Sequence, residues 1–271
     1  MCLETYFTFR PPLLKKDKTQ GGVFKSTGRN NNYKRVTSML KKSTLEQVVS
    51  EDMKDIWDVL RPEEKRLITD NFSLQQYKKG QIIYAEHEEP ENLWCLVKGK
   101  VKMYKSGVGD REQILRLYRP VQYFGYRAYF AQENYVSSCA ALEASTLGCV
   151  PMSVVEKIIR SNNELAMFFI HELARNLGGS DTKIVNLTQK HIRGRLADAL
   201  LLLEDNYGLE DDDATLKIYM SREDLANLSN MTTSNAIRTL TSFVAEKLIL
   251  VDGRRIKILN EPQLRKISKF G

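Results

Sequence analysis

The order of helix, turn and hairpin signals between Ser221 and Leu259 limits what this chain can fold into more than any other feature. The letters SRED from Ser221 to Asp224 form a capping box, in which the serine hydroxyl accepts a hydrogen bond from the Asp224 backbone amide. This box opens a short helix that buries Leu225 and Leu228. After the turn SNM, Thr232 is a good N-cap for a second helix over 233–247. Two helices joined by about three residues predict a helix-turn-helix.

The second helix of this pair has two different faces. Its inner face is predicted to bury Ala236, Leu240, Phe243 and Val244. The opposite face carries polar side chains that donate and accept hydrogen bonds and that a DNA major groove can admit; these are Thr233, Ser234, Asn235, Arg238 and Ser242. The pattern predicts a recognition helix.

The letters KLILVDGRRIKIL that follow predict a hairpin beside this helix. Two alternating apolar strands surround Asp252-Gly253, a residue pair that favours a type I′ turn. Arg254, Arg255 and Lys257 lie on or beside this wing and are expected to hold DNA phosphates, as is Arg222 at the start of the first helix. The other interpretation is a winged helix that docks a protein and leaves its polar helix face solvated.

The preceding part of the chain changes from helical to β-type periodicity. Helical segments are expected from Asp52 to Leu60 and from Pro62 onward. An all-β roll is predicted over about 70–152, with hairpin turns at Lys98-Gly99 and at 106–110; its strand-like runs are QIIYAE, NLWCLVKG, KVKMYK, EQILRLY, SSCAALEA and LGCVPM. Before the capping box we expect a helix from His191 to Asn206 and a short strand LKIYM.

A long apolar stripe with helical spacing follows the roll. Its members are Leu165, Phe168, Phe169, Leu173, Leu177, Ile184 and Leu187. Such a stripe packs on its own β-domain or pairs with a second copy, and we expect a homodimer. The candidate dimer-helix residues are Leu165, Phe169, Leu173, Leu177, Ile184 and Leu187. The Gly178-Gly179 pair is expected to loosen this helix.

Charge and composition define the remaining expectations. Residues 1–42 hold ten Lys or Arg and two acids, so residues 1–45 are expected to be a disordered basic leader. This leader is either a solvated tail, a stretch ahead of the true start at Met39 or Met53, or an arm attracted to phosphates. With no secretory signal and no apolar run of about 20 residues, we expect a cytoplasmic protein without a membrane partner. The chain has no P-loop, G-x-S-x-G or metal-ligand spacing, which predicts no enzyme, no catalytic residue and no metal site.

Residues 70–260 together resemble the cyclic-AMP receptor/fumarate-nitrate regulator (Crp/Fnr) family of bacterial transcription factors. The resemblance rests on KKGQIIYAEHEEPENLWCLVKGKVKMY, YFGYRAYF, LAMFFIHELARNLGGSDTKIVNLTQ and SREDLANLSNMTTSNAIRTLTSFVAEKLI. It implies an α+β fold with an N-terminal cyclic-nucleotide-binding-like β-roll, a long dimerisation helix and a C-terminal winged helix-turn-helix. The expected domains are 46–160, 161–190 and 191–271, after the leader.

The resemblance also implies a function, that of a homodimer reading two half-sites in successive major grooves of double-stranded DNA, with RNA polymerase as a further partner. Thr233, Ser234 and Arg238 fall on base-contacting positions, and Thr232, Asn235 and Arg222 on phosphate-contacting ones. The best-known member has an Arg-Glu pair at Thr233-Ser234, so a different operator is expected. The alternative is a cyclic-nucleotide-responsive signalling module without DNA binding.

The sensory segment departs from the cyclic-AMP-binding members. Their cassette reads Gly-Glu-Leu and ends in Arg-Ser, whereas this chain has Gly125-Tyr126-Arg127 and Ser137-Ser138. Without the ribose-binding Glu and the phosphate-binding Arg, we expect no cyclic-AMP binding. The candidate effector-pocket residues are Gly125, Tyr126, Arg127, Tyr135, Ser137 and Ser138. The crowded aromatic residues of this segment form either core or an effector pocket, and Arg127 either meets an anion or pairs with Glu133.

Other cofactors follow from the same resemblance. Cys2 alone cannot supply the N-terminal cysteine group that holds the iron–sulfur cluster of the oxygen-sensing branch, so no cluster is expected. Haem-binding relatives use a histidine, and His87, His171 and His191 leave haem open, although a lone histidine is more often an interface residue. Cys95 and Cys139 lie in apolar strands, where inert thiols are expected. The sequence does not identify an effector.

Overall fold

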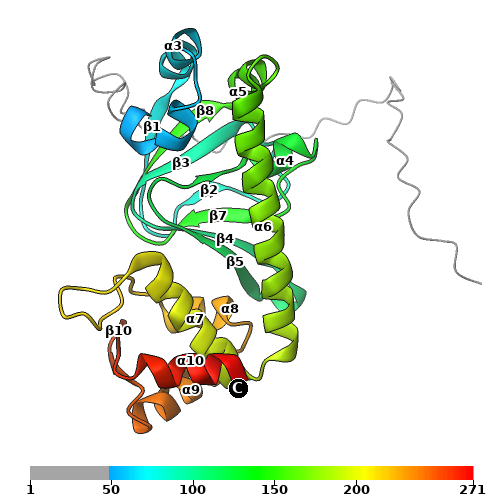
Figure 1. Ribbon diagram of the computed structural model, residues 1–271. Coiled ribbons are helices and arrows are strands. Elements are labelled where there is room, and N and C mark those ends of the chain that lie inside the picture. The colour runs from blue at the N-terminus through cyan, green and yellow to red at the C-terminus, as the bar shows by residue number, and fades with distance from the viewer. Residues whose placement is uncertain (1–48, 271) are drawn as a thin grey trace, which may run out of the picture. The chain divides into compact units, whose positions relative to one another are not determined.

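The computed structural model describes residues 49–270, in which two antiparallel β-sheets, a long helix and a helical C-terminal domain follow one another (Figure 1). The prediction for residues 1–45 lies outside the described residues. The elements before the long helix are α2 (Lys54–Trp57), α3 (Pro62–Asn71), β1 (Ser73–Tyr77), β2 (Ile82–Tyr84), β3 (Asn92–Lys98), β4 (Val101–Ser106), η2 (Val108–Asp110), β5 (Glu112–Tyr118), β6 (Tyr123–Phe124), α4 (Tyr126–Phe130), β7 (Ser138–Ala141), β8 (Ser145–Pro151) and α5 (Met152–Ile159). The remaining elements are α6 (Asn163–Gln189), α7 (Ile192–Tyr207), α8 (Arg222–Leu228), α9 (Thr233–Ala245), β9 (Ile249–Asp252), β10 (Arg255–Ile258) and α10 (Glu261–Phe270).

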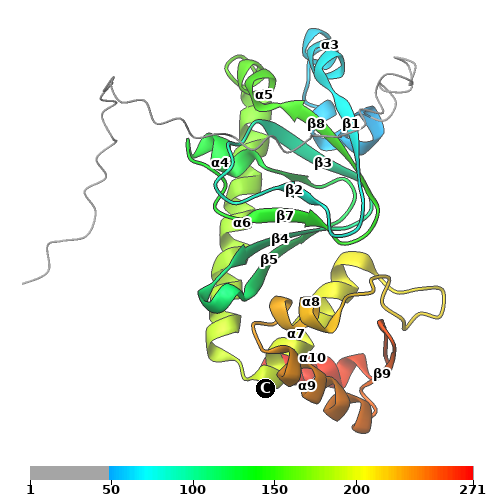
Figure 2. The same ribbon diagram turned by 180° about the vertical axis from the view of Figure 1, so that it is seen from behind.

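The strands form two four-stranded sheets, with the orders β1-β8-β3-β6 and β2-β7-β4-β5 (Figure 2). The hairpin turn predicted at 106–110 is confirmed, because β4 pairs with β5 from Ser106↔Glu112 onward. The hairpin predicted at Lys98-Gly99 is wrong, since β3 and β4 belong to different sheets. Gly99 carries the chain between them at a φ of +102°, and a Cβ there would lie 2.3 Å from the Ser145 Oγ.

Strand β3 is buried on both faces, which explains its nearly continuous apolar sequence. Trp94 and Leu96 pack inside the roll, whereas Leu93 and Cys95 pack with apolar residues of α3, α5 and α6. The sequence pattern identified this run as a strand. The short strands β1 and β6 were not singled out, because five and two residues carry too little alternation.

Helix α6 is continuous across Gly178 and Gly179, neither of which meets a neighbour that a Cβ would contact. The Asn162 side chain caps its first turn by accepting a hydrogen bond from the Leu165 backbone amide at 3.0 Å. Leu165 and Phe169, 1% and 2% exposed, belong to the core on the helix-covered side of the roll. Their assignment to a dimer seam is therefore wrong, because their own domain already covers them.

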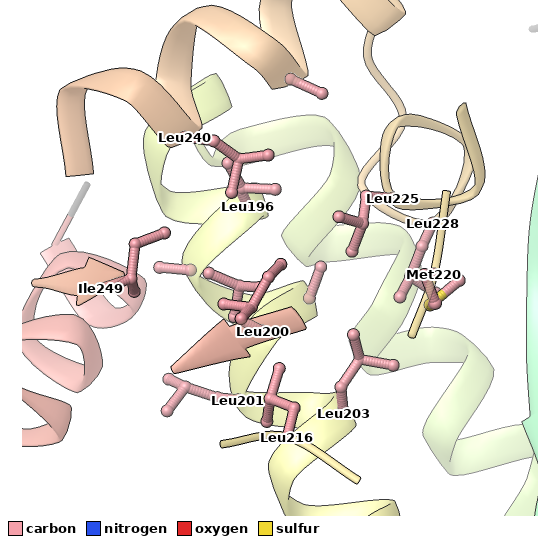
Figure 3. Close-up of a cluster of buried hydrophobic side chains, with 14 of the residues drawn as sticks. Leu196, Leu200, Leu201, Leu203, Leu216, Met220, Leu225, Leu228, Leu240 and Ile249 are labelled. Carbon is pink, nitrogen blue, oxygen red and sulfur yellow. The ribbon is translucent and has the colours of Figure 1, made fainter. Parts of the chain in front are cut away.

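The C-terminal domain has its own hydrophobic core, drawn in Figure 3. Leu196, Leu200 and Leu203 of α7 lie at its centre, with Leu225 of α8 and Leu240 of α9 packed against them. The helix predicted from His191 to Asn206 is confirmed within one residue at each end.

Two local predictions in this domain fail. The letters LKIYM form no strand, because only Thr215 and Leu216 make isolated bridges, to Lys257 and Leu209. Val244 is 40% exposed instead of facing inward, and Thr239 is buried on that side of α9. Each residue turns a helix by about 100°, so a residue at the edge of an apolar stripe can face either the core or solvent. Burial is therefore hardest to predict at such edge positions.

Within residues 49–270 no helix combines the length and the apolar character needed to span a membrane. The side chains of Cys95, Cys139 and Cys149 are buried. Burial raises the pKa of Cys95 and of Cys139 well above the ordinary value, which keeps both as unreactive thiols.

Candidate nucleic-acid interface and effector cavity

Both helices of the helix-turn-helix begin with the caps that the sequence predicts. The Ser221 Oγ accepts a hydrogen bond from the Asp224 backbone amide at 2.9 Å, and the Thr232 Oγ1 accepts one from the Asn235 amide at 3.3 Å. Ser229 and Asn230 separate α8 from Met231, which is buried in the domain core. These caps set where α8 and α9 begin, and hence which side chains α9 presents.

A Ser221→Ala change is expected to lower the free energy of unfolding by about 1 kcal/mol, because it removes the cap of α8. Denaturant unfolding followed by circular dichroism measures this difference. Ser234→Ala is the matched control, since Ser234 is exposed and caps nothing, and its effect is expected to stay within about 0.5 kcal/mol. Equal effects of the two changes would contradict the capping role.

The outer face of α9 carries the candidate base-contacting residues. Thr233, Ser234 and Arg238 are exposed, and so is Thr232 at the helix start, with Asn235 half-buried beside them. Within residues 49–270 the Arg238 guanidinium forms no hydrogen bond and no ion pair, so its five N–H donors are open to an outside acceptor. Ile237, directly before Arg238, is also exposed at 48%.

A contact that the sequence did not indicate ties α9 to α7. The Arg193 guanidinium donates to both carboxylate oxygens of Glu246 at 2.7 and 2.8 Å and to the Ser242 Oγ at 2.8 Å. It also lies 5.0 Å from the centre of the Phe243 ring. Hydrogen bonds from Arg193 and Ser242 lower the pKa of the Glu246 carboxyl to about 2. Ser242 is thus committed to this cluster and is not part of the open face.

The wing differs from its predicted turn. Strand β9 pairs with β10 from Asp252↔Arg255, which leaves Gly253 and Arg254 as the two turn residues. Of these only Gly253 has a positive φ, at +54°, as a type II′ turn requires of its first residue. The predicted type I′ turn over Asp252-Gly253 is therefore wrong by one residue.

Arg222 connects the helix-turn-helix to this wing. Its Nη2 donates to the Gly253 carbonyl oxygen at 2.6 Å, and its Nη1 is buried without a hydrogen-bond partner in the described chain. Arg222 thus holds the tip of the wing against the start of α8, a role that the sequence did not suggest.

The basic residues of the wing are not equivalent. Arg255 forms an ion pair with Glu210 at 2.5 Å, and Lys257 forms one with Asp212 at 3.2 Å. Both acids belong to the loop between α7 and α8, which therefore already neutralises these two cations. Arg254 is exposed and has no hydrogen bond or ion pair to residues 49–270. Of the three, Arg254 is the one free to meet a phosphate.

The candidate effector residues surround the start of α4. Gly125 has a φ of +92°, and a Cβ there would lie 2.7 Å from the Trp94 ring and 2.8 Å from the Asn92 carbonyl oxygen, so glycine is required. Tyr126 is buried, and Arg127 forms an ion pair with Glu133 at 2.7 Å, one of the two arrangements that the sequence left open.

Three more candidates lie nearby. Tyr135 is buried and stacks on Tyr84 with ring centres 3.8 Å apart. Ser137 is buried, and the Ser138 Oγ accepts a hydrogen bond from the Glu86 backbone amide at 2.9 Å. Gly125, Tyr126, Arg127, Tyr135 and Ser137 line one cavity of about 620 Å³, which Ser138 does not reach. The aromatic residues thus serve both as core and as cavity wall.

The histidines lie apart from this cavity. His87, His171 and His191 are exposed, and none of them lines it.

Comparison with known proteins assigns both halves of the described chain. The family model of the cyclic nucleotide-binding domain matches residues 74–162, and the Crp-like helix-turn-helix domain matches residues 194–267. The first region contains most of the roll, and the second contains the capped helix pair with its wing.

Relatives align with this chain over most of their own length. The chain is 21% identical over 215 residues to a CRP-like cAMP-activated global transcriptional regulator of Mycobacterium tuberculosis, covering 79% of this chain and 96% of the relative. It is 24% identical to the global nitrogen regulator of Synechococcus elongatus, covering 69% and 86%. The structure of FixK2 from Bradyrhizobium japonicum superposes with a TM-score of 0.66 at 23% identity, over 73% of this chain and 97% of that one.

Proposed function

Because the chain belongs to the Crp/Fnr family of DNA-binding transcription regulators, we propose that it acts as a homodimer whose two α9 helices read the half-sites of a two-fold symmetric operator. The observation that carries this proposal is the exposed outer face of α9, where Thr233, Ser234 and the unpaired Arg238 lie together beside the wing. A signalling module without DNA binding has no use for such a face.

The residues divide into two roles. Arg238 has the planar fork that donates to O6 and N7 of a guanine, whereas the hydroxyls of Thr233 and Ser234 supply weaker and less selective bonds. Phosphate contacts fall to Arg254 at the wing tip and to Thr232 and Asn235 at the start of α9. Arg222, expected from the sequence to hold a phosphate, instead holds the wing through the Gly253 carbonyl oxygen, and its Nη1 is buried. Arg255 contributes only if DNA displaces Glu210 from it.

The dimer seam is proposed on the exposed face of α6. Ile170, Leu177 and Ile184 are spaced seven residues apart and are 52%, 64% and 60% exposed. A heptad repeat of large apolar side chains that their own domain leaves uncovered is the pattern of a helix that pairs with a second copy. Leu173 and Leu187 are half-buried beside this line.

Strand β5 of the roll contacts the C-terminal domain. Ile114 is fully buried in the hydrophobic core of the C-terminal domain, and the Gln113 side chain reaches the Leu228 carbonyl oxygen at 3.5 Å. Lys102 of β4 bridges Glu112 of β5 and Asp224 of α8 at 3.0 and 2.9 Å. Through these contacts, a conformational change in the roll caused by ligand binding can alter the position of α8.

Cyclic AMP is not the effector in this proposal, although the mycobacterial relative is named as cAMP-activated. The acidic and basic side chains that would hold its ribose and phosphate are absent from the cassette, and Arg127 is paired with Glu133. Calorimetric titration of the protein with cyclic AMP at micromolar concentrations is expected to show no binding heat. A clear stoichiometry would overturn this part of the proposal.

A regulator bound at a promoter acts on RNA polymerase, which we take as the further partner, and in a bacterium both are found in the cytoplasm. The relatives reported above are named as regulators, and we assign no catalytic step to this chain.

Methylation interference on bound DNA fragments tests the proposed reading mode. Guanine N7 methylation is expected to block binding at two patches centred about 34–36 Å apart, one for each α9. A single patch, or interference spread evenly along the fragment, would contradict a symmetric dimer in successive major grooves.

A further inference from the structure

The cavity of about 620 Å³ is lined by the roll, by α4 and by α6, and it is open to solvent on one side. Its wall is mainly apolar and aromatic. The roll contributes Tyr84, Met103, Tyr118, Phe124 and Tyr135, and α6 contributes Leu173, Leu187 and the seam residues Leu177 and Ile184. Two pairs of rings lie face to face, Tyr84 on Tyr135 at 3.8 Å and Tyr118 on Phe124 at 4.7 Å. The hydroxyls of Tyr84 and Tyr118 both point to the Met103 sulfur at 3.8 Å, which leaves the ring faces to shape the space.

The charged side chains of the cavity wall are all cations. Arg116, Arg127 and Lys183 line it, and its wall contains no aspartate or glutamate. Arg127 is neutralised by Glu133. Neither Arg116 nor Lys183 forms an ion pair with any acid of residues 49–270. A half-buried pair of cations without a counter-ion is costly in a protein, which indicates that an anion completes the site.

Both cations are held in place by neutral groups. Arg116 donates to the Asn176 side chain and backbone oxygens at 2.5 and 2.9 Å and to the Ser180 Oγ at 3.0 Å. The Lys183 ammonium donates to the carbonyl oxygens of Ile114 and Leu115 at 2.9 and 3.1 Å. Burial and the neighbouring Arg116 lower the pKa of Lys183 to about 8. The ammonium has three donors, so one N–H remains for a ligand.

We propose that this cavity binds a small organic carboxylate with a flat apolar body, whose carboxylate lies against Lys183 and Arg116 and whose body lies among the tyrosine and phenylalanine rings. The volume is in the range of small-molecule sites. Stacking with aromatic rings favours a planar body, and two adjacent cations favour one concentrated negative charge.

A nucleotide fits this wall poorly. The wall offers ribose hydroxyls only neutral acceptors, such as the Ser137 hydroxyl, and no carboxylate, whose charge-assisted hydrogen bonds are about twice as strong. A small organic carboxylate has no ribose hydroxyls and therefore needs no acidic side chain in the wall.

Residues of strand β5 form part of the ligand site. Arg116, Ile114 and Leu115 belong to this strand, and Ile114 reaches into the core of the C-terminal domain. A bound carboxylate that draws the Lys183 ammonium toward itself weakens its hydrogen bonds to the Ile114 and Leu115 carbonyl oxygens. These bonds link α6 to β5. Signalling by this route rests on the proposed function, whereas binding of the carboxylate does not.

The test uses two fluorescent probes with the same kind of aromatic body. Anilinonaphthalene sulfonate carries one negative charge, and N-phenyl-1-naphthylamine carries none. The full-length protein is expected to bind the sulfonate at one site per subunit, with 3-phenylpropionate displacing it better than 3-phenylpropionamide does. The Lys183→Met variant is expected to bind the sulfonate at least about tenfold more weakly while its affinity for the neutral probe changes by less than about threefold.

Two further variants keep the result interpretable. Lys183→Arg retains the cation and is expected to restore sulfonate binding, and Lys157→Met removes an exposed lysine of α5 and is expected to change neither probe. Thermal melts confirm that each variant is folded. No sulfonate binding by the wild type, no advantage of 3-phenylpropionate over its amide, or equal losses for both probes in Lys183→Met, would overturn the proposal.

These titrations contain no DNA. Failure of the carboxylate site would leave operator binding intact, and failure of operator binding would leave the probe titrations unchanged.

Discussion

The Ile170→Asp variant is expected to be a monomer in solution and to bind the operator at least about 100-fold more weakly than the wild type. Ile170 is 52% exposed on α6 and does not line the effector cavity, so a carboxylate there leaves the fold of one subunit intact. In the dimer the same carboxylate would be buried beside its symmetry-related copy, which is strongly unfavourable. A monomer reaches only one half-site and loses the gain in affinity that comes from linking two reading helices.

Light scattering gives the mass and fluorescence anisotropy gives the operator affinity. Thr182→Asp is the matched control, because Thr182 is exposed on another side of α6. It is expected to remain a dimer with nearly unchanged operator binding. A dimeric mass for Ile170→Asp would remove Ile170, Leu177 and Ile184 as the seam.

The Arg238→Ala variant is expected to lose about 1–3 kcal/mol of operator binding, and the loss is expected to depend on one base pair in each half-site. The guanidinium is exposed at the outer face of α9 and forms no hydrogen bond or ion pair with residues 49–270, so its removal is expected to leave the fold intact. With the wild type, changing that base pair weakens binding. With Arg238→Ala, all four bases at that position are expected to bind about equally.

Arg254→Ala provides the contrast, since Arg254 lies at the wing tip and is assigned to a phosphate. Its loss is expected to weaken binding to every sequence alike and to reduce the slope of affinity against salt concentration by about 1. If Arg238→Ala gave that uniform, salt-dependent behaviour instead, Arg238 would be a phosphate contact and the groove assignment would fail.

The helix-turn-helix could be predicted because its signals are local. Ser221 caps α8 through an amide three residues away, and Thr232 caps α9 in the same way. Both helices have the periodicity of a surface helix over a common core. A short sequence window contains everything that these elements need.

The orientation of α9 could not be predicted in this way. Arg193 and Glu246 are 53 residues apart, and nothing near either residue indicates the other. Likewise the sequence shows that Leu165 and Phe169 are buried, but periodicity cannot say whether a roll or a second copy covers them. The one-residue shift of the wing turn has a local cause: the register Asp252↔Arg255 places Gly253 first in the turn, whereas the residue types alone favoured Asp252-Gly253.

Only some residues of the effector cavity could be predicted from the sequence. Gly125, Tyr126, Arg127, Tyr135 and Ser137 were found because one short segment holds them. Arg116 and Lys183 come from β5 and α6, and nothing in the sequence of either element indicates that these two residues lie side by side. Their meaning depends on a wall without acids, which only the three-dimensional arrangement reveals.

Selection of bound duplexes from a random pool tests the central claim most directly, namely that α9 of this chain distinguishes bases in DNA. The expected result is a two-fold symmetric consensus with half-sites about one helical turn apart and a guanine in each that is lost from the consensus of Arg238→Ala. A pool that stays random after repeated rounds at low ionic strength, with and without 3-phenylpropionate, would contradict the account.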